Sequence, residues 1–264
     1  MLVLIKGAGD IATGIALRLF RAGMQIVMTD LEQPTAIRRT VAFSQAIPQG
    51  TTVVEGITGR KSTAEHVAAV LAAGEIPVLA DPACLCKDLL HPDVIVDAIL
   101  AKKNLGTHIT DAPTVIAVGP GFSAGSDCHA VVETMRGHYL VRVILNGPAT
   151  PNTNIPGLIG GYAGERVLRA PCDGFFRPEL EIGARVEAGD VAGYVNNEPM
   201  CCTIGGILRG ILSDGIAVHQ GMKAGDVDPR CELAHCYCAS DKALAVGGGV
   251  LEAILQLTGV LNHG

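Results

Sequence analysis

Apolar and polar positions follow two alternating periods along the first part of the chain. Short apolar runs, typical of strands buried on both faces of a sheet, occupy residues 1–6, 25–30, 51–56 and 75–81. Helical spacing of apolar residues, or a proline suited to a first helical turn, marks residues 11–23, 34–46 and 62–74. This alternation of strands and helices predicts a parallel, doubly wound α/β sheet.

The same pattern continues through the middle of the chain and then stops. Further apolar runs lie at residues 94–104, 114–121, 129–135 and 139–145. Residues 146–164 have many Pro, Gly and Asn residues and no apolar period, which is typical of a loop between domains. We therefore expect a sheet domain over residues 1–145 and a linker over 146–164.

A repeat characterises the part that follows the linker. The sequence AGDV occurs at 188–191 and again at 224–227, 36 residues apart. Short strand-like runs and glycine turns between these anchors predict a small two-fold β domain over 165–230, resembling a biotinyl/lipoyl-type hammerhead domain. The hairpin that carries the modified lysine in such carriers contains no lysine here, so we do not expect a covalent carrier.

The C-terminal segment, 231–264, contains cysteines and an apolar tract. Residues 243–261 reach the length of a membrane span, but they include Glu252 and three consecutive glycines. We therefore expect a buried helix that ends at Gly259, and no membrane insertion.

Composition excludes several classes of protein. The chain has 264 residues, a net charge of −6, only 3% aromatic residues and no block of basic residues. Nucleic-acid binding is therefore not expected, because it needs basic surfaces or exposed aromatic rings. Nine cysteines spread along a chain of this length favour reduced thiols and a cytoplasmic location.

The strongest motif is a glycine fingerprint between the first strand and the first helix. Its loop residues are Gly7, Ala8, Gly9, Asp10 and Ile11, and Ala12 completes the pattern G-x-G-x-x-A. Asp30 ends the second strand, where a carboxylate can accept a ribose hydroxyl, as in NAD sites. These features predict a Rossmann-like nucleotide-binding domain, although Asp10 would repel a pyrophosphate unless its carboxylate faces away or holds a metal or a hydroxyl.

Other candidate residues have weaker signals. Gly119 and Gly121 form a second glycine loop after a strand, which favours either an anion-binding nest or a simple connection. Cys84 follows a strand of the predicted sheet, and Cys236 lies in a cluster with Cys231, His235 and Cys238. Such thiols are either nucleophiles or packing residues, and the spacing of the cluster matches no standard metal site.

Several phrases together resemble one family over nearly the whole chain, from Lys6 to Leu255. They are GAGDIATGIALRL, PTAIRRTVAF, DAILAKKNLGT, VGPGFSAGSDCHAVVETMRGHYLVRVI, ERVLRAPCDG, GDVDPR and SDKALAVGGGVLEAIL. They resemble the accessory proteins of the selenium-dependent molybdenum hydroxylase system (the YqeB type), which are related to xanthine dehydrogenase accessory proteins.

This resemblance implies a cytoplasmic role in the maturation of a selenium-dependent molybdenum hydroxylase, which would be the partner. It also implies a molybdopterin dinucleotide as an alternative to NAD at the glycine fingerprint. Cys236 falls on a cysteine of the family pattern, so it is the first candidate to carry selenium or sulfur, and Cys84 is the second. Two alternatives stay open: an NAD-dependent oxidoreductase, and a non-enzymatic assembly module. The sequence also leaves open whether the chain forms a homo-oligomer.

Overall fold

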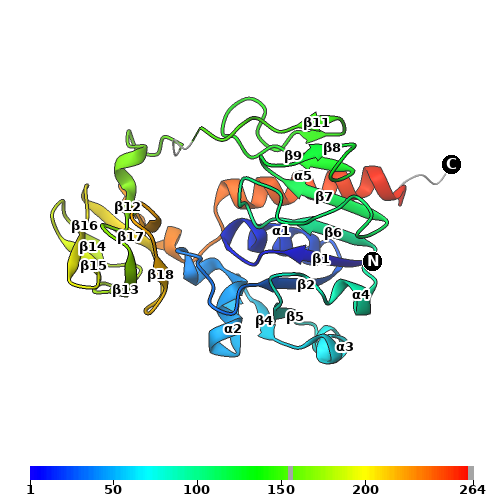
Figure 1. Ribbon diagram of the computed structural model, residues 1–264, viewed down its shortest axis with the longest axis horizontal. Coiled ribbons are helices and arrows are strands. Elements are labelled where there is room, and N and C mark those ends of the chain that lie inside the picture. Colours follow the sequence, from blue (N-terminus) through cyan, green and yellow to red (C-terminus); the bar gives the residue numbers. More distant parts are fainter. Residues whose placement is uncertain (154–156, 261–264) are drawn as a thin grey trace. The chain divides into compact units, whose positions relative to one another are not determined.

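The computed structural model describes residues 1–153 and 157–260, which form two compact units (Figure 1). The first unit comprises Met1–Pro34, Phe43–Thr153 and Ala239–Gly264, and the second comprises Thr35–Ala42 and Asn154–Cys238. The boundaries expected from the sequence follow the chain in order, whereas the structure interleaves the two units.

A mixed sheet of nine strands forms the centre of the first unit in the described part of the chain. Seven neighbouring strands run parallel, and one antiparallel strand lies at each edge. In spatial order the strands are β10 (Val143–Ile144), β9 (Ala130–Val132), β7 (Thr114–Val118), β6 (Val94–Asp97), β1 (Leu2–Lys6), β2 (Gln25–Asp30), β5 (Ile76–Ala80), β4 (Ile57–Lys61) and β3 (Thr51–Val54). A separate antiparallel pair joins β8 (Ser123–Ala124) and β11 (Gly147–Pro148).

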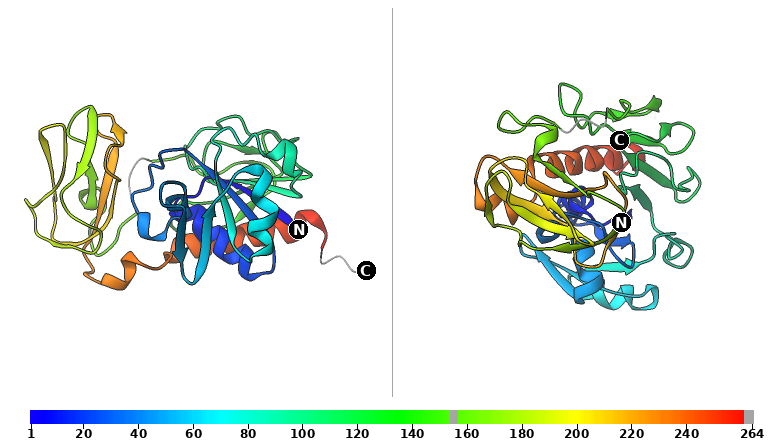
Figure 2. Two further views of the ribbon diagram at one scale, coloured as in Figure 1. Left: turned by 90° about the horizontal axis from the view of Figure 1, so that it is seen from below. Right: turned by 60° about the vertical axis from the view of Figure 1, so that its left-hand side comes forward.

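Two long helices of the first unit, α1 (Asp10–Arg21) and α5 (Asp241–Thr258), pack side by side (Figures 1 and 2). A Cβ at Gly14 would lie 2.6 Å from Ala243, and a Cβ at Gly247 would lie 2.8 Å from Arg18. From the first contact to the second, the chain advances by about one turn in both helices, from Gly14 to Arg18 in α1 and from Ala243 to Gly247 in α5. The two helices therefore run parallel. The two N-termini therefore lie at the same edge of the sheet.

The remaining helices are short. They are α2 (Ala46–Gln49), α3 (Val67–Ala72), α4 (Lys87–Leu90) and the 3₁₀ helices η1 (Arg39–Val41), η2 (Phe43–Gln45), η3 (Ala64–His66), η4 (Gly164–Arg166) and η5 (Leu233–Cys236). Most crossovers between the parallel strands are consequently irregular.

The predicted fold class, a Rossmann-like parallel sheet followed by a hammerhead domain and a C-terminal helix, is wrong. The sheet is mixed. At one edge, Glu55 and Gly56 form a tight turn with φ of +48° and +80° that makes β3 and β4 an antiparallel hairpin, and at the other edge β10 pairs antiparallel with β9. The helix expected over residues 34–46 does not form as one element, and residues 35–42 belong to the second unit. The chain after β6 also forms no helix, and Leu100 and Lys102 there have positive φ.

The second unit consists of two four-stranded antiparallel sheets. The first contains β12 (Val167–Arg169), β19 (Lys223–Asp228), β17 (Gly206–Ile211) and β14 (Arg185–Val186), in that order. The second contains β16 (Glu198–Cys201), β15 (Val191–Val195), β13 (Gly174–Pro178) and β18 (Ala217–Val218). Phe176, Leu208 and Ile211 are among the side chains buried in the common core.

An internal repeat is present in this unit, but not in the predicted register. The first AGDV lies at a turn before β15, and the second lies within β19, so the two are not equivalent. The glycines with positive φ give the true relation: Gly174, Gly183 and Gly189 correspond to Gly206, Gly215 and Gly221, each 32 positions later. The repeat of 36 residues expected from AGDV is therefore corrected to 32.

Candidate functional site

The turn between β1 and α1 holds the glycine fingerprint. Gly7 has φ of +96°, and a Cβ there would lie 2.9 Å from the carbonyl oxygen of Ala98, so the fold itself requires glycine. Gly9 precedes α1 with φ of −69°, and apart from its chain neighbours no described residue has an atom within 4 Å of the position of its missing Cβ. The fold therefore does not require glycine at position 9. The absence of a side chain there leaves open space in front of the helix.

Asp30 closes the turn from the neighbouring strand. Its Oδ2 accepts a hydrogen bond from the Ala8 N–H at 2.7 Å, and its Oδ1 accepts one from the Leu31 N–H at 2.7 Å. Burial raises the pKa of Asp30, while these two N–H groups act in the opposite direction. The structure thus brings Asp30 together with the glycine turn.

Two fingerprint residues face the protein rather than the open space. Ala8 is fully buried, and its carbonyl oxygen accepts a hydrogen bond from the Ser44 N–H at 2.9 Å. Ile11 is also buried in the core. The side chains of Ala8 and Ile11 therefore pack inside the protein. At these two positions a ligand in front of α1 would contact only backbone atoms.

Charged residues surround Asp10, the first residue of α1. Lys242, in the first turn of α5, is half-buried, and burial followed by the charge of Arg136 lowers its pKa, whereas Asp10 and Glu133 raise it. Arg136 makes a bidentate ion pair with Asp241, with nitrogen–oxygen distances of 2.9 and 3.0 Å. The charge of Lys242 therefore opposes that of Asp10, a feature that the local sequence does not reveal.

Glu133 is held by the backbone at the end of β9. Its carboxylate accepts hydrogen bonds from the N–H groups of Thr134, Met135 and Thr150 at 2.7, 2.7 and 2.8 Å. Burial raises the pKa of Glu133, but these bonds outweigh that effect and lower it. Glu133 is consequently a fixed negative charge close to Lys242.

The second glycine loop serves packing. Gly119 and Gly121 have φ of +80° and +111°. A Cβ at Gly119 would lie 2.7 Å from the Thr134 hydroxyl, and a Cβ at Gly121 would lie 2.6 Å from the backbone nitrogen of Lys103. These close approaches account for both glycines without a ligand, and binding there stays a prediction.

A buried polar cluster lies at the carboxyl ends of neighbouring strands and includes Cys84. Lys6 ends β1 and contacts Asp97, the last residue of β6, at 3.5 Å. The Thr107 hydroxyl donates to Asp97 at 2.6 Å and is hydrogen-bonded to Lys6. All four residues are at most 5% exposed. Sequence patterns missed Lys6, Asp97 and Thr107, because nothing in their local spacing distinguishes them from strand ends and loop residues.

The environment of Cys84 favours its thiolate. A hydrogen bond from the Cys86 thiol and the charge of Lys6 lower the pKa of Cys84, although burial opposes them. Cys86 shows the reverse: its contact with Cys84 and its own burial raise its pKa. Cys84 also has φ of +57°, in the left-handed region. The two thiols of this pair therefore differ in pKa, and that of Cys84 is the lower.

Cys236 belongs to the second unit, whereas the glycine turn belongs to the first. It is fully buried, and burial raises its pKa despite the opposing charges of Arg38 and Arg209. A buried, protonated thiol is a poor nucleophile. Among the described residues, no three His, Cys, Asp or Glu side chains gather as a metal site would require.

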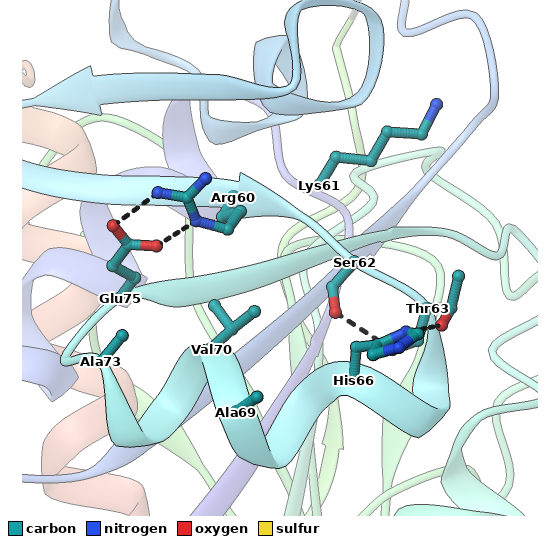
Figure 3. Close-up of a pocket in the computed structure, with 9 residues that line it drawn as sticks. All are labelled: Arg60, Lys61, Ser62, Thr63, His66, Ala69, Val70, Ala73 and Glu75. Atoms are coloured by element: carbon teal, nitrogen blue, oxygen red, sulfur yellow. Dashed lines mark hydrogen bonds and ion pairs between the residues drawn. The ribbon is translucent and has the colours of Figure 1, made fainter.

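An open hollow of about 650 Å³ lies between β4 and α3 (Figure 3). Ala69, Val70 and Ala73 line its apolar side. Arg60 is paired with Glu75, and the Thr63 hydroxyl contacts His66 Nδ1 at 2.9 Å. Since its polar side chains already satisfy one another, the hollow is a weaker candidate than the glycine turn.

None of the helices in the described residues is both long and apolar enough to cross a membrane.

Comparison with solved structures gives only distant similarities. An aspartoacylase family protein from Mesorhizobium loti matches with 13% identity and a TM-score of 0.27, over 86% of this chain and 84% of that chain. A succinylglutamate desuccinylase/aspartoacylase from Rhodobacter sphaeroides matches with 16% identity and a TM-score of 0.28, over the same shares. TM-scores this low carry no argument about chemistry.

Comparison with curated proteins gives a much stronger match. No protein-family model matches the chain. The chain is 51% identical over 257 residues to the uncharacterized protein YqeB of Escherichia coli strain K12, and the alignment covers 97% of this chain and 48% of that protein. The chain thus spans about half the length of this relative. It is a homologue of YqeB over nearly all of its own length, which supports the resemblance to the YqeB type.

Proposed function

We propose that this chain binds a dinucleotide through its pyrophosphate at the turn formed by Gly7, Ala8 and Gly9. The observation that carries the proposal is the open space at Gly9. The backbone angles of Gly9 suit any residue, and a Cβ would meet no described atom within 4 Å, so the fold does not require glycine there. A ligand that approaches the backbone closely does require it.

The chemistry of the turn suits a diphosphate. The first turn of α1 presents backbone N–H groups and the positive end of the helix dipole toward the open space. Asp30 stands beside the turn, and each of its oxygens keeps a lone pair beyond its backbone hydrogen bond. That carboxylate can accept a ribose hydroxyl. The ligand is therefore a molybdopterin dinucleotide or NAD.

The wider role that we propose is that of an accessory factor in the maturation of a selenium-dependent molybdenum hydroxylase. The homology to YqeB over 97% of this chain and the family resemblance of its motifs support this role. In such a factor the glycine turn would hold the cofactor before its transfer. The hydroxylase is the proposed partner, and the role of this chain does not depend on catalysis.

Titration of the purified chain with molybdopterin cytidine dinucleotide and with NAD tests the proposal. We expect one of them to bind, and we expect Gly9→Asp to weaken binding at least about tenfold, because it places a negative charge beside the diphosphate. Aspartate is a favourable residue before a helix, so this variant should keep its fold.

The matched control is Gly248→Asp. It adds the same charge at an exposed position of α5 where a Cβ likewise meets nothing within 4 Å. This variant should bind like the wild type. The proposal fails if neither dinucleotide binds at millimolar concentration, or if Gly9→Asp binds as tightly as the control.

A further inference from the structure

The N-terminus of α5 completes the surroundings of the glycine turn. Parallel packing of α1 and α5 through Gly14 and Ala243 brings the first turns of both helices to the same edge of the sheet. Residues 239–264 belong to the same unit as the turn, although more than 200 positions separate them from it in sequence. A side chain in the first turn of α5 can therefore act at the start of α1.

Lys242 is the side chain in that position. It is half-buried and feels the charges of Asp10 on α1, Glu133 after β9, and Arg136 and Asp241. Arg136 is already paired with Asp241, and Glu133 is held by three backbone N–H groups. Lys242 makes no direct hydrogen bond or ion pair with any residue that the structure describes.

An ammonium group in partial burial without a direct partner is unfavourable, because it has lost hydration and gained no hydrogen bond. Burial lowers the pKa of Lys242 for the same reason, and repulsion by the charge of Arg136 lowers it further. An anion within reach would remove this cost. The open space at Gly9 adjoins Asp10, whose charge acts on Lys242, so an anion bound in front of α1 would lie near the ammonium group.

We infer that Lys242 contacts the diphosphate of the ligand bound at Gly9, so that the C-terminal segment supplies the cation of the site. This inference rests on the proposed function and adds a residue to it. The ligand class is an anion with a pyrophosphate group, either free or within a dinucleotide. Lys242 would also offset the repulsion between that anion and Asp10.

The test is titration with inorganic pyrophosphate and, separately, with the dinucleotide that the wild type binds. We expect Lys242→Gln to weaken binding of both at least about tenfold, whereas Lys242→Arg retains binding. Lys223→Gln, which removes a lysine charge from the second unit, is the matched control and should bind like the wild type. Equal thermal unfolding midpoints for the variants exclude loss of the fold.

The pH dependence gives a second readout. Because the pKa of Lys242 is lowered, the wild type should lose affinity for pyrophosphate on raising the pH from neutral toward about 10, as the ammonium group loses its proton. Lys242→Arg keeps its charge throughout this range and should lose less affinity. The ionisation of pyrophosphate affects both titrations equally, so it does not contribute to the difference between the two proteins.

The outcomes separate this inference from the proposed function. Unchanged binding of both ligands by Lys242→Gln overturns the inference, while sensitivity of dinucleotide binding to Gly9→Asp still supports the proposed function. Pyrophosphate binding that depends on Lys242, with no dinucleotide bound, supports the anion site and overturns the dinucleotide proposal. Failure of the wild type to bind either ligand overturns both.

Discussion

Two glycines in the turn after β1 have different roles. Gly7 is required by its left-handed backbone and by the close carbonyl oxygen of Ala98. Gly9 has an ordinary backbone and open space before it, so the fold does not require glycine there, and the role that we propose for it is ligand binding. A sequence motif treats the two alike, and only their surroundings show which of them the fold requires.

The residues that the sequence could predict are those of a continuous motif. The fingerprint and Asp30 could be found because the turn, the strand end and their spacing lie within one short stretch of chain. Lys6, Asp97 and Lys242 could not, because their roles depend on neighbours brought together by the sheet and by helix packing. The roles predicted for Cys84 and Cys236 stay predictions, although their environments differ sharply.

Cys84 offers a prediction at the scale of a single thiol. Its thiolate should form below the pH at which an ordinary cysteine ionises, because Cys86 and Lys6 lower its pKa. Ultraviolet absorbance of thiolate, followed against pH, measures this ionisation. The difference between wild type and Cys84→Ser should show a titration below about 8.5.

Two variants serve as controls for this thiol. Cys128→Ser should remove no titration in the neutral range, because burial raises the pKa of Cys128 to about 12. The double variant Lys6→Met with Asp97→Asn removes the nearby positive charge without leaving Asp97 as an uncompensated buried charge. It should move the Cys84 titration to higher pH, and an unmoved titration would contradict the role of Lys6.

At the scale of elements, the contact between α1 and α5 determines where two helix N-termini lie. The strands and helices with clear periodicity, such as β1, α1 and β2, lie where the sequence predicts them. The hairpin of β3 and β4 was missed, because Glu55-Gly56 is not one of the usual hairpin signals such as Asn-Gly or Asp-Gly. The helix expected over residues 34–46 failed because Ile37 packs against the core of the second unit, a contact that local propensity cannot show.

Gly14→Ala tests the helix contact. The new Cβ would lie 2.6 Å from Ala243, so we expect the free energy of unfolding to fall by about 1–3 kcal/mol. Chemical denaturation of the first unit measures this change. Gly248→Ala is the control: it is exposed, a Cβ there meets nothing within 4 Å, and alanine should stabilise the helix by about 0.5–1 kcal/mol. Equal gains in both variants would disprove the close contact.

At the scale of the whole molecule, the two units are interleaved in sequence. The segment Thr35–Ala42 belongs to the second unit, where the Ile37 carbonyl accepts a hydrogen bond from the Ile211 N–H at 2.8 Å. The Arg38 guanidinium donates to the carbonyl oxygens of His235 and Cys238 at 2.9 and 3.1 Å. Contacts between such distant positions leave no periodic signal in the sequence. The predicted boundaries, which follow the chain in order, therefore did not assign residues 35–42 to the second unit.

Buried ion pairs connect the strands of the second unit to its flanking turns. Asp226 pairs with Arg166 and, at 2.8 Å, with Arg209 Nε. Asp228 pairs with Arg209 at 3.1 Å and with Arg230 at 2.6 Å. Because both carboxylates are buried, removal of an arginine partner would leave an uncompensated buried charge.

This network predicts how the stability of the second unit depends on pH. Burial raises the pKa of Asp228, but the hydrogen bonds from Arg230 and the charges of Arg209 and Arg230 lower it to about 2. Since the folded pKa lies below the unfolded value of about 3.9, the stabilisation is complete above that value and is lost as the pH falls toward 2. Denaturation at a series of pH values should show that the free energy of unfolding falls by roughly 2 kcal/mol because of this residue.

Asp228→Asn should flatten that dependence, whatever its stability at neutral pH. Asp214→Asn, at an exposed carboxylate of the same unit, should leave the slope unchanged. A slope that is equal in wild type and Asp228→Asn would show that this carboxylate does not control the acid stability of the unit.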